Sequence, residues 1–128
     1  MGKIIIDSCV YIALISETDS QHNLAESLFG TMENAEIILP DCVYMEVLNI
    51  LKSKTDLIRC GKFLQLIEYL NTDISFNNPE ESESASRYFF QQNRLSFQDS
   101  LVLALARAEK ADLLTFDKAL QSAWNRLK

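Results

Sequence analysis

Glycine and proline are scarce in this sequence, with three and two copies among 128 residues. Disordered and low-complexity chains are usually rich in such residues, whereas this chain is 48% hydrophobic. A chain of this length can bury a sizeable core without disulfides or metals. We therefore expect a single domain over residues 1–128, without a linker or an internal repeat.

A long hydrophobic run is also missing. No apolar stretch approaches the roughly 20 residues that a membrane-spanning helix needs. The N-terminal segment MGKIIIDSCVYIALIS has one lysine before an apolar stretch, as a signal peptide does. Asp7 interrupts that stretch and no small-residue cleavage site follows, so we interpret it as a strand running into a helix. We expect a cytoplasmic protein with no membrane association.

Cysteines are few and show no pairing pattern. Cys9, Cys42 and Cys60 are odd in number, form no C-x-x-C pair and lie in or beside apolar segments. Buried reduced thiols therefore explain them better than a disulfide or a zinc site.

Basic residues are fewer than acidic ones. The chain has 12 lysines and arginines and 18 aspartates and glutamates, so its net charge is −6. This balance argues against a protein that coats nucleic acid through bulk positive charge. It does not exclude an enzyme that gathers carboxylates around divalent cations. Four candidate site acids account for four of these charges, so the site alone can explain most of the imbalance.

Unbroken apolar runs mark the expected strands. The runs at 4–6, 37–39 and 113–116 do not alternate with polar residues, which is typical of a parallel sheet covered on both faces. A weaker candidate strand, 73–76, precedes the turn signal Asn77-Asn78-Pro79. Helical patterns fill the intervals, over 8–17, about 21–32, Pro40 to about Lys54, 57–71, Glu80 to Asn93, from Ser96 onward, and after Asp117.

The resulting order is βααβααβααβα. Alternating strands and helices predict an α/β fold, a three-layer α/β/α sandwich around a short parallel sheet of about four strands.

Two acids fall at strand ends. Asp7 follows the first strand, and Asp117 follows the last one. Ligands of open parallel sheets bind beyond the carboxyl ends of the strands. If these two strands are neighbours, their axes lie about 4.8 Å apart, and both carboxylates can reach one metal ion.

Two further acids stand out on apolar helices. Glu46 is the only acid between Asp41 and Asp56, and Asp99 lies in the first turn of the most apolar helix. A lone acid on a buried helix is costly unless it is paired or binds a cation.

Each acid also has a purely structural explanation. Asp7 and Asp117 can cap the helices that follow them, and Asp99 can complete a capping box with Ser96. Glu46 alone can be a solvated side chain. The structural account needs four separate coincidences, whereas a single site explains all four acids together.

The segments IIIDSCVYIALI and LSFQDSLVLALARAEKADLLTFD, with a glutamate in an apolar helix between them, resemble the PIN domain family, particularly its VapC-type toxin ribonucleases. The resemblance covers nearly the whole chain and is most specific over 95–117. It implies an acidic quartet that binds Mg²⁺ or Mn²⁺ and cleaves single-stranded RNA. The matching quartet is Asp7, Glu46, Asp99 and Asp117, with Ser8 and Thr115 at supporting polar positions.

The same resemblance implies partners. A small antitoxin would cover the acidic cleft, the free form would be a homodimer, and the helices at 21–32 and 57–71 are candidate interaction surfaces. Many members continue into a fifth strand after the last acid, where this chain has the helical pattern ALQSAWNRLK. We therefore expect four strands, which leaves any dimer contact through that edge open.

Oxygen ligands suit hard ions such as Mg²⁺ or Mn²⁺, and the single histidine and scattered cysteines argue against zinc. The mechanistic hypothesis is metal-assisted phosphodiester hydrolysis. Asp7 and Asp99 are assigned as direct ligands, Asp117 as a ligand or water holder, and Glu46 as a ligand or general base.

Arg94 precedes Asp99 and Lys118 follows Asp117, so both are candidates to contact substrate phosphates. Solvated surface charges are an equally good explanation of each.

Four other interpretations compete. An aspartate-nucleophile phosphatase would want D-x-D, and position 9 is cysteine. A phosphoacceptor receiver domain would want lysine after a late strand, where Asp117 stands. A PIN-like scaffold that binds RNA or protein without cutting, and a housekeeping RNA-processing nuclease, share the expected fold.

Overall fold

The computed structural model describes residues 2–53, 57–92 and 94–128. Within these residues four strands and seven helices follow one another in the predicted order. The elements are β1 (Lys3–Ile6), α1 (Ser8–Ile15), α2 (His22–Phe29), β2 (Glu36–Pro40), α3 (Asp41–Ser53), α4 (Leu57–Tyr69), β3 (Thr72–Ser75), α5 (Pro79–Gln91), α6 (Phe97–Glu109), β4 (Asp112–Leu114) and α7 (Lys118–Leu127). The prediction of an α/β fold with a four-stranded sheet is confirmed.

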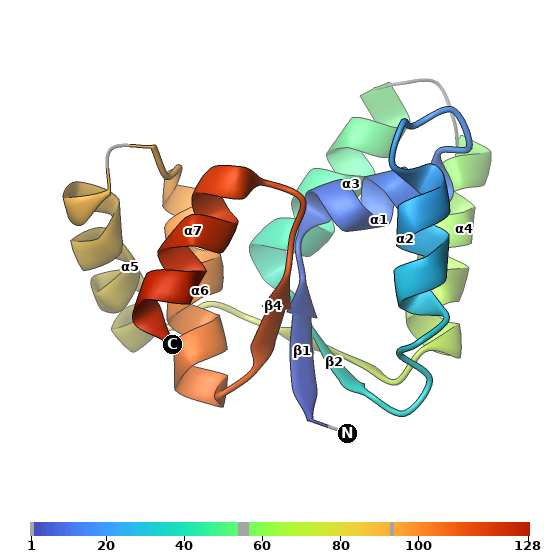
Figure 1. Cartoon of the computed structure of the whole chain (residues 1–128). Helices are drawn as coiled ribbons and strands as arrows, with labels where there is room; N and C mark the ends of the chain where they lie inside the picture. The colour runs from blue at the N-terminus through green and yellow to red at the C-terminus, as the bar shows by residue number, and fades with distance from the viewer. Residues whose placement is uncertain (1, 54–56, 93) are drawn as a thin grey trace.

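All strand pairs are parallel, and the strand order in the sheet is β3-β2-β1-β4. The chain builds outward from β1 to β2 and β3, and then returns to place β4 on the other side of β1 (Figure 1). The direction of winding therefore reverses between β1 and β4. In open α/β sheets this reversal point is where ligands bind.

The helices form a layer on each side of the sheet. Figure 1 shows α1 to α4 on one side and α5, α6 and α7 on the other. This division follows from the winding of the chain. The connections from β1 to β2 and from β2 to β3 move along the sheet in one direction, and the connection from β3 to β4 moves in the opposite direction. The core between the layers is largely aliphatic and includes two aromatic rings. Its fully buried residues include Ile5, Ile6, Ile37, Leu39, Val43, Val102, Leu103, Tyr11 and Phe63.

Several expected element ends were wrong. Pro40 was expected in the first turn of a helix, but it is the last residue of β2 and pairs with Ser75. The last strand ends at Leu114, so Thr115 and Phe116 lie outside the sheet. Its only partner in the described chain is β1, whose ladder ends at Ile6 opposite Leu114.

Lys54 and Asn93, the expected ends of two helices, lie outside the described residues. The C-terminal segment is helical as predicted, forming α7. Its buried residues Leu120, Ala123 and Trp124 face the core. No helix in the described ranges is long and apolar enough to span a bilayer.

Candidate active site

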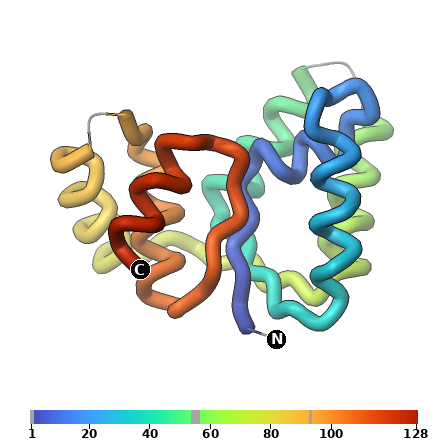
Figure 2. Tube along the Cα trace, in the orientation of Figure 1, coloured from blue at the N-terminus to red at the C-terminus, as the bar shows by residue number. Residues whose placement is uncertain are grey.

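Asp7 and Asp117 come from the two strands at which the winding reverses. Asp7 directly follows β1, and its backbone N–H donates to the Leu114 carbonyl of β4 at 2.9 Å. Asp117 does not follow β4 directly, as was expected, but lies three residues beyond it. The tube in Figure 2 traces β1 and β4 side by side up to this edge. Both acids therefore follow the carboxyl ends of two neighbouring strands.

The Thr115 hydroxyl connects these two acids. It donates to Asp7 Oδ2 at 2.8 Å and accepts the backbone N–H of Asp117 at 3.0 Å. Thr115 is itself buried, with 8% of its surface exposed. Thr115 and Phe116 thus form a short bend between β4 and Asp117, and the Thr115 hydroxyl bonds this bend to Asp7.

Ser8 connects Asp7 to the third acid. Its backbone N–H donates to Asp7 Oδ1 at 2.9 Å, and its side-chain hydroxyl donates to Glu46 Oε1 at 2.9 Å. Glu46 lies near the middle of α3, 38 residues along the chain from Ser8. The supporting positions expected from the sequence, Ser8 and Thr115, are therefore the residues that hold Asp7 in place.

Asp99 lies at the start of α6 and completes the expected capping box. Its backbone N–H donates to the Ser96 hydroxyl at 3.0 Å, and its Oδ2 accepts the Ser96 N–H at 3.3 Å. Burial raises the pKa of Asp99, the bonds from Ser96 oppose this, and the negative charges of Asp7 and Asp117 raise it further. Asp99 therefore lies within the electrostatic field of the two strand-end acids.

The environment of Asp7 is unusual for a carboxylate. Only 5% of its surface is exposed, and this burial is the main cause that raises its pKa. Hydrogen bonds from Thr115, Ser8 and Cys9 lower the pKa, and the charge of Glu46 raises it. A buried carboxylate among other carboxylates is costly, because desolvation and like charge both disfavour ionisation. A buried acid with a raised pKa, surrounded by other acids, is typical of functional sites.

Capping also accounts for part of each acid's position. Asp7 is the N-cap of α1, and Asp117 caps α7 by accepting the Leu120 N–H at Oδ1, at 3.0 Å. The structural explanation of these acids thus holds alongside the site. Capping does not explain why Glu46 is joined to Asp7 through Ser8. It also does not explain why the charges of Asp7 and Asp117 raise the pKa of Asp99.

The four acids offer only oxygen donors, which are the ligands that hard divalent ions prefer. Among the described residues, however, no three histidine, cysteine, aspartate or glutamate side chains lie close enough together to hold a metal ion. Several carboxylate oxygens accept backbone N–H groups, as in Asp7, Asp99 and Asp117. The donor chemistry and the buried negative charge fit Mg²⁺ or Mn²⁺, and ligation requires the side chains to converge further.

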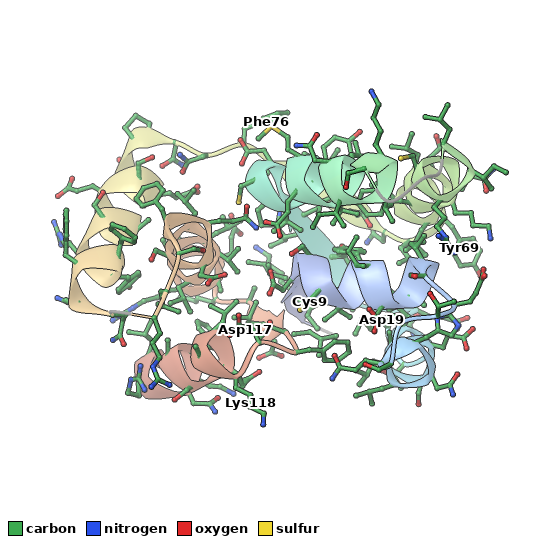
Figure 3. The ribbon with its side chains drawn as sticks, turned by 90° about the horizontal axis from the view of Figure 1, so that it is seen from above. Cys9, Asp19, Tyr69, Phe76, Asp117 and Lys118 are labelled. Atoms are coloured by element: carbon green, nitrogen blue, oxygen red, sulfur yellow. The ribbon has the colours of Figure 1, made fainter. Side chains whose placement is uncertain are left out.

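Cys9 was predicted to be a buried reduced thiol, and in the structure it contacts Asp7. Its Sγ lies 3.5 Å from Asp7 Oδ2 and 3.6 Å from the Thr115 hydroxyl, and burial raises its pKa. In Figure 3, which looks down on this edge of the sheet, Cys9 and Asp117 both lie near the centre. Cys9, Cys42 and Cys60 are free thiols as predicted, although each is half-buried.

Arg94 and Lys118, predicted as phosphate contacts, line one hollow of about 450 Å³. A third cation there, Arg126, was not predicted from the sequence. Lys118, Ser122 and Arg126 recur every four residues along α7, so they share one helix face. This four-residue spacing is the sequence signal that could have identified Arg126.

The PIN domain model matches residues 4–123 of the chain. Among solved structures, the chain is similar to VapC20 of Mycobacterium tuberculosis, described as a toxin that cleaves the sarcin–ricin loop. The TM-score is 0.83 at 17% identity, over 94% of both chains. It is also similar to PAE2754 of Pyrobaculum aerophilum, with a TM-score of 0.66 at 13% identity, over 98% of this chain and 94% of that one. A search of curated proteins found no match.

These similarities agree with the element order and the sheet. At such identities the solved structures show the fold, and the family model adds the sequence evidence over nearly the whole length. The chain belongs to the PIN domain family.

Proposed function

We propose that this chain, acting as a single PIN domain over residues 1–128, is a metal-dependent endoribonuclease that hydrolyses phosphodiester bonds of single-stranded RNA. The observation that carries the proposal is the bonded set at the winding reversal, where Thr115 and Ser8 join Asp7 to Asp117 and Glu46. The family supports it, because PIN domain nucleases are ribonucleases and generally use divalent metal ions.

Asp7 and Asp99 are the residues that would hold Mg²⁺ or Mn²⁺, with Asp117 as a further ligand or water holder. A bound ion of this kind acidifies water and neutralises charge on a phosphate. The chain's own contribution is positioning. Thr115 fixes the Asp7 carboxylate, and Ser8 keeps Glu46 turned toward the same edge, where it can accept a proton from water.

The biological role that we propose is that of a toxin in a toxin–antitoxin pair, acting on cytoplasmic RNA. The similarity to VapC20 supports this role. An antitoxin and a second copy of the chain are the proposed partners. Exposed apolar side chains on the expected surfaces favour such contacts, with Leu24 on α2 and Leu57, Leu64 and Tyr69 on α4.

Cleavage of an RNA panel by the purified chain tests the proposal. The panel should hold single-stranded oligonucleotides and stem–loops, including a sarcin–ricin loop, each with Mg²⁺, Mn²⁺ or EDTA. We expect cleavage that needs the metal and is lost in Asp99→Asn. The matched control is Asp112→Asn, which makes the same change at an exposed acid at the opposite end of β4.

The outcomes separate the alternatives. Cleavage by Asp99→Asn at the rate of the unmodified chain would refute the assignment of the site. RNA binding without metal and without cleavage favours a non-catalytic scaffold instead. Cleavage confined to precursor RNAs favours a housekeeping processing nuclease over a toxin.

A further inference from the structure

A basic hollow adjoins the acids. It lies between α7 and the segment that leads from α5 to α6, and its volume is about 450 Å³. Three of its described lining residues are cations and none is an acid, although the chain as a whole carries six net negative charges. The lining residues are Gln92, Arg94, Leu95, Lys118, Ala119, Ser122 and Arg126. We call this site the basic pocket.

Neutral groups hold the guanidinium of Arg126 in place. Its Nη2 donates to Gln92 Oε1 at 2.7 Å, and its Nη1 donates to the Ser122 hydroxyl at 3.0 Å. These bonds orient the side chain without neutralising its charge. A guanidinium fixed in this way retains donors and full charge for an anion.

The cations of the basic pocket lie outside the ion pairs of the described residues. The ion pairs in the described ranges use Lys3, His22, Lys62 and Arg87, and none uses a cation of the basic pocket. A second hollow, of about 420 Å³ between α5 and α6, contains Arg87, which pairs with Glu83, and Arg107, which donates to the Tyr88 hydroxyl. Three cations outside these ion pairs therefore line the basic pocket together, whereas the second hollow combines one paired and one unpaired arginine.

On each side of the basic pocket, the lining residues are close in sequence to the start of a helix that carries one of the candidate acids. Lys118 is the first residue of α7 and follows its N-cap Asp117, so their Cα atoms are about 3.8 Å apart. Figure 3 labels both residues at the start of this helix, with Asp117 nearer the centre of the view. On the other wall, Arg94 precedes Ser96, which caps the helix that carries Asp99. An RNA strand at the acids would thus pass the pocket.

We propose that the basic pocket binds a phosphate of the RNA backbone beside the cleaved bond. The proposal rests on the proposed ribonuclease function. A polyanion is repelled by four carboxylates, so the substrate needs cations nearby to hold it in register. Arg94 and Arg126 supply planar donors suited to phosphate oxygens, and Lys118 adds a point charge. Arg126 is the positioning residue that this inference adds.

RNA binding by a non-cleaving protein tests the pocket. In the Asp7→Asn background, affinity for a single-stranded oligonucleotide is measured across a salt series, with and without Arg126→Gln or Arg94→Gln. A substitution that removes one phosphate-binding cation should lower the salt slope by about 0.7, equivalent to about five-fold in affinity for each ten-fold dilution of salt. Arg87→Gln is the matched control, because it removes the same charge from the other hollow.

Neutral methylphosphonate links, placed one at a time, then identify the phosphate. We expect one or two links to weaken binding to the intact pocket and to have no further effect on Arg126→Gln. An oligonucleotide with and without a 5′-phosphate distinguishes an internal link from a terminal phosphate group.

The two proposals fail separately. If the unmodified chain cleaves RNA but Arg126→Gln and Arg94→Gln match Arg87→Gln in salt slope and in the methylphosphonate series, the pocket is overturned and the nuclease stands. If the unmodified chain neither binds nor cleaves any RNA with metal present, the proposed function itself is wrong.

Discussion

One hydroxyl, that of Thr115, serves two of the candidate acids, because it donates to Asp7 and accepts from the Asp117 backbone. Replacing it by the isosteric valine keeps the volume and removes both bonds. Groups that orient metal ligands typically contribute 10- to 100-fold to metal affinity or activity. We therefore expect Thr115→Val to lower RNA cleavage by about 10- to 100-fold and to shift the Mg²⁺ titration to higher concentration.

Thr115→Ser is the matched control, since it restores the hydroxyl and should recover most of the activity. A Thr115→Val protein with unchanged cleavage and an unchanged metal titration would contradict the positioning role. Circular dichroism before each assay confirms that both variants are folded.

Asp7 gives a pH-dependent prediction. Burial raises its pKa above the unfolded value of about 3.9, so the folded state disfavours the ionised form. The resulting loss of stability is absent below the unfolded pKa and grows as the pH rises through the folded pKa. Without metal, Asp7→Asn should therefore be more stable than the unmodified chain at pH 7, and the difference should vanish near pH 3.

Urea unfolding in EDTA across this pH range measures the effect. Asp112→Asn, at an exposed acid, should show no such pH-dependent gain. A less stable Asp7→Asn protein at pH 7 would mean that its hydrogen bonds outweigh the burial of its charge.

The sequence offered candidate site residues but not the contacts between them. The positions of Asp7 and Ser8 after the first strand were visible along the chain, whereas Thr115 was expected inside the last strand. The bond between Ser8 and Glu46 joins residues 38 positions apart, and only the packing of α3 against α1 creates it. Arg126 was accessible in principle from its spacing to Lys118, but its relevance depends on the loop that carries Arg94.

At the scale of elements, α1 is held by aromatic packing around Tyr11. Its ring lies 5.8 Å from that of Phe29 on α2 and 5.3 Å from that of Phe63 on α4. The Tyr11 hydroxyl is buried without a hydrogen-bond partner in the described structure. An unsatisfied buried polar group costs about 1–3 kcal/mol. Tyr11→Phe should therefore raise the free energy of unfolding by about 1 kcal/mol, measured by urea denaturation.

Tyr69→Phe is the control, because that residue is 79% exposed and its hydroxyl meets solvent. It should leave stability unchanged, while both variants keep RNA cleavage intact. Destabilisation by Tyr11→Phe would show that the hydroxyl has a partner in solution, such as an ordered water.

Element types were predictable where apolar periodicity was strong, but element ends were not. The run from Leu113 to Phe116 is continuous in sequence, yet the ladder stops at Leu114 because β1 stops at Ile6. Such an end depends on the partner strand, which a local pattern cannot reveal. Pro40 shows the same effect, since it suits a helix start as well as the end of β2.

For the whole molecule, alternation of strands and helices predicted the layers but not the strand order. The arrangement β3-β2-β1-β4 places Asp7 and Asp117 on neighbouring strands. In a sheet with β4 beside β3, the same residues would lie at opposite edges. The site therefore depends on a topological choice that the strand runs themselves do not encode.

The four candidate acids lie around one edge of the sheet, in a chain whose net charge is −6. A cation that binds this site and not the unfolded chain stabilises the fold by mass action, by about 2.7 kcal/mol at 100 times its Kd. We expect Mn²⁺ or Mg²⁺ to raise the thermal midpoint of the unmodified chain and of Asp112→Asn. Asp99→Asn should lose most of this rise.

Sodium chloride at equal ionic strength should not reproduce the rise in thermal midpoint, since screening acts on all exposed charges alike. Equal stabilisation of all three proteins by the divalent ion would show that it acts through general charge screening, and the four acids would then have no special affinity for metal.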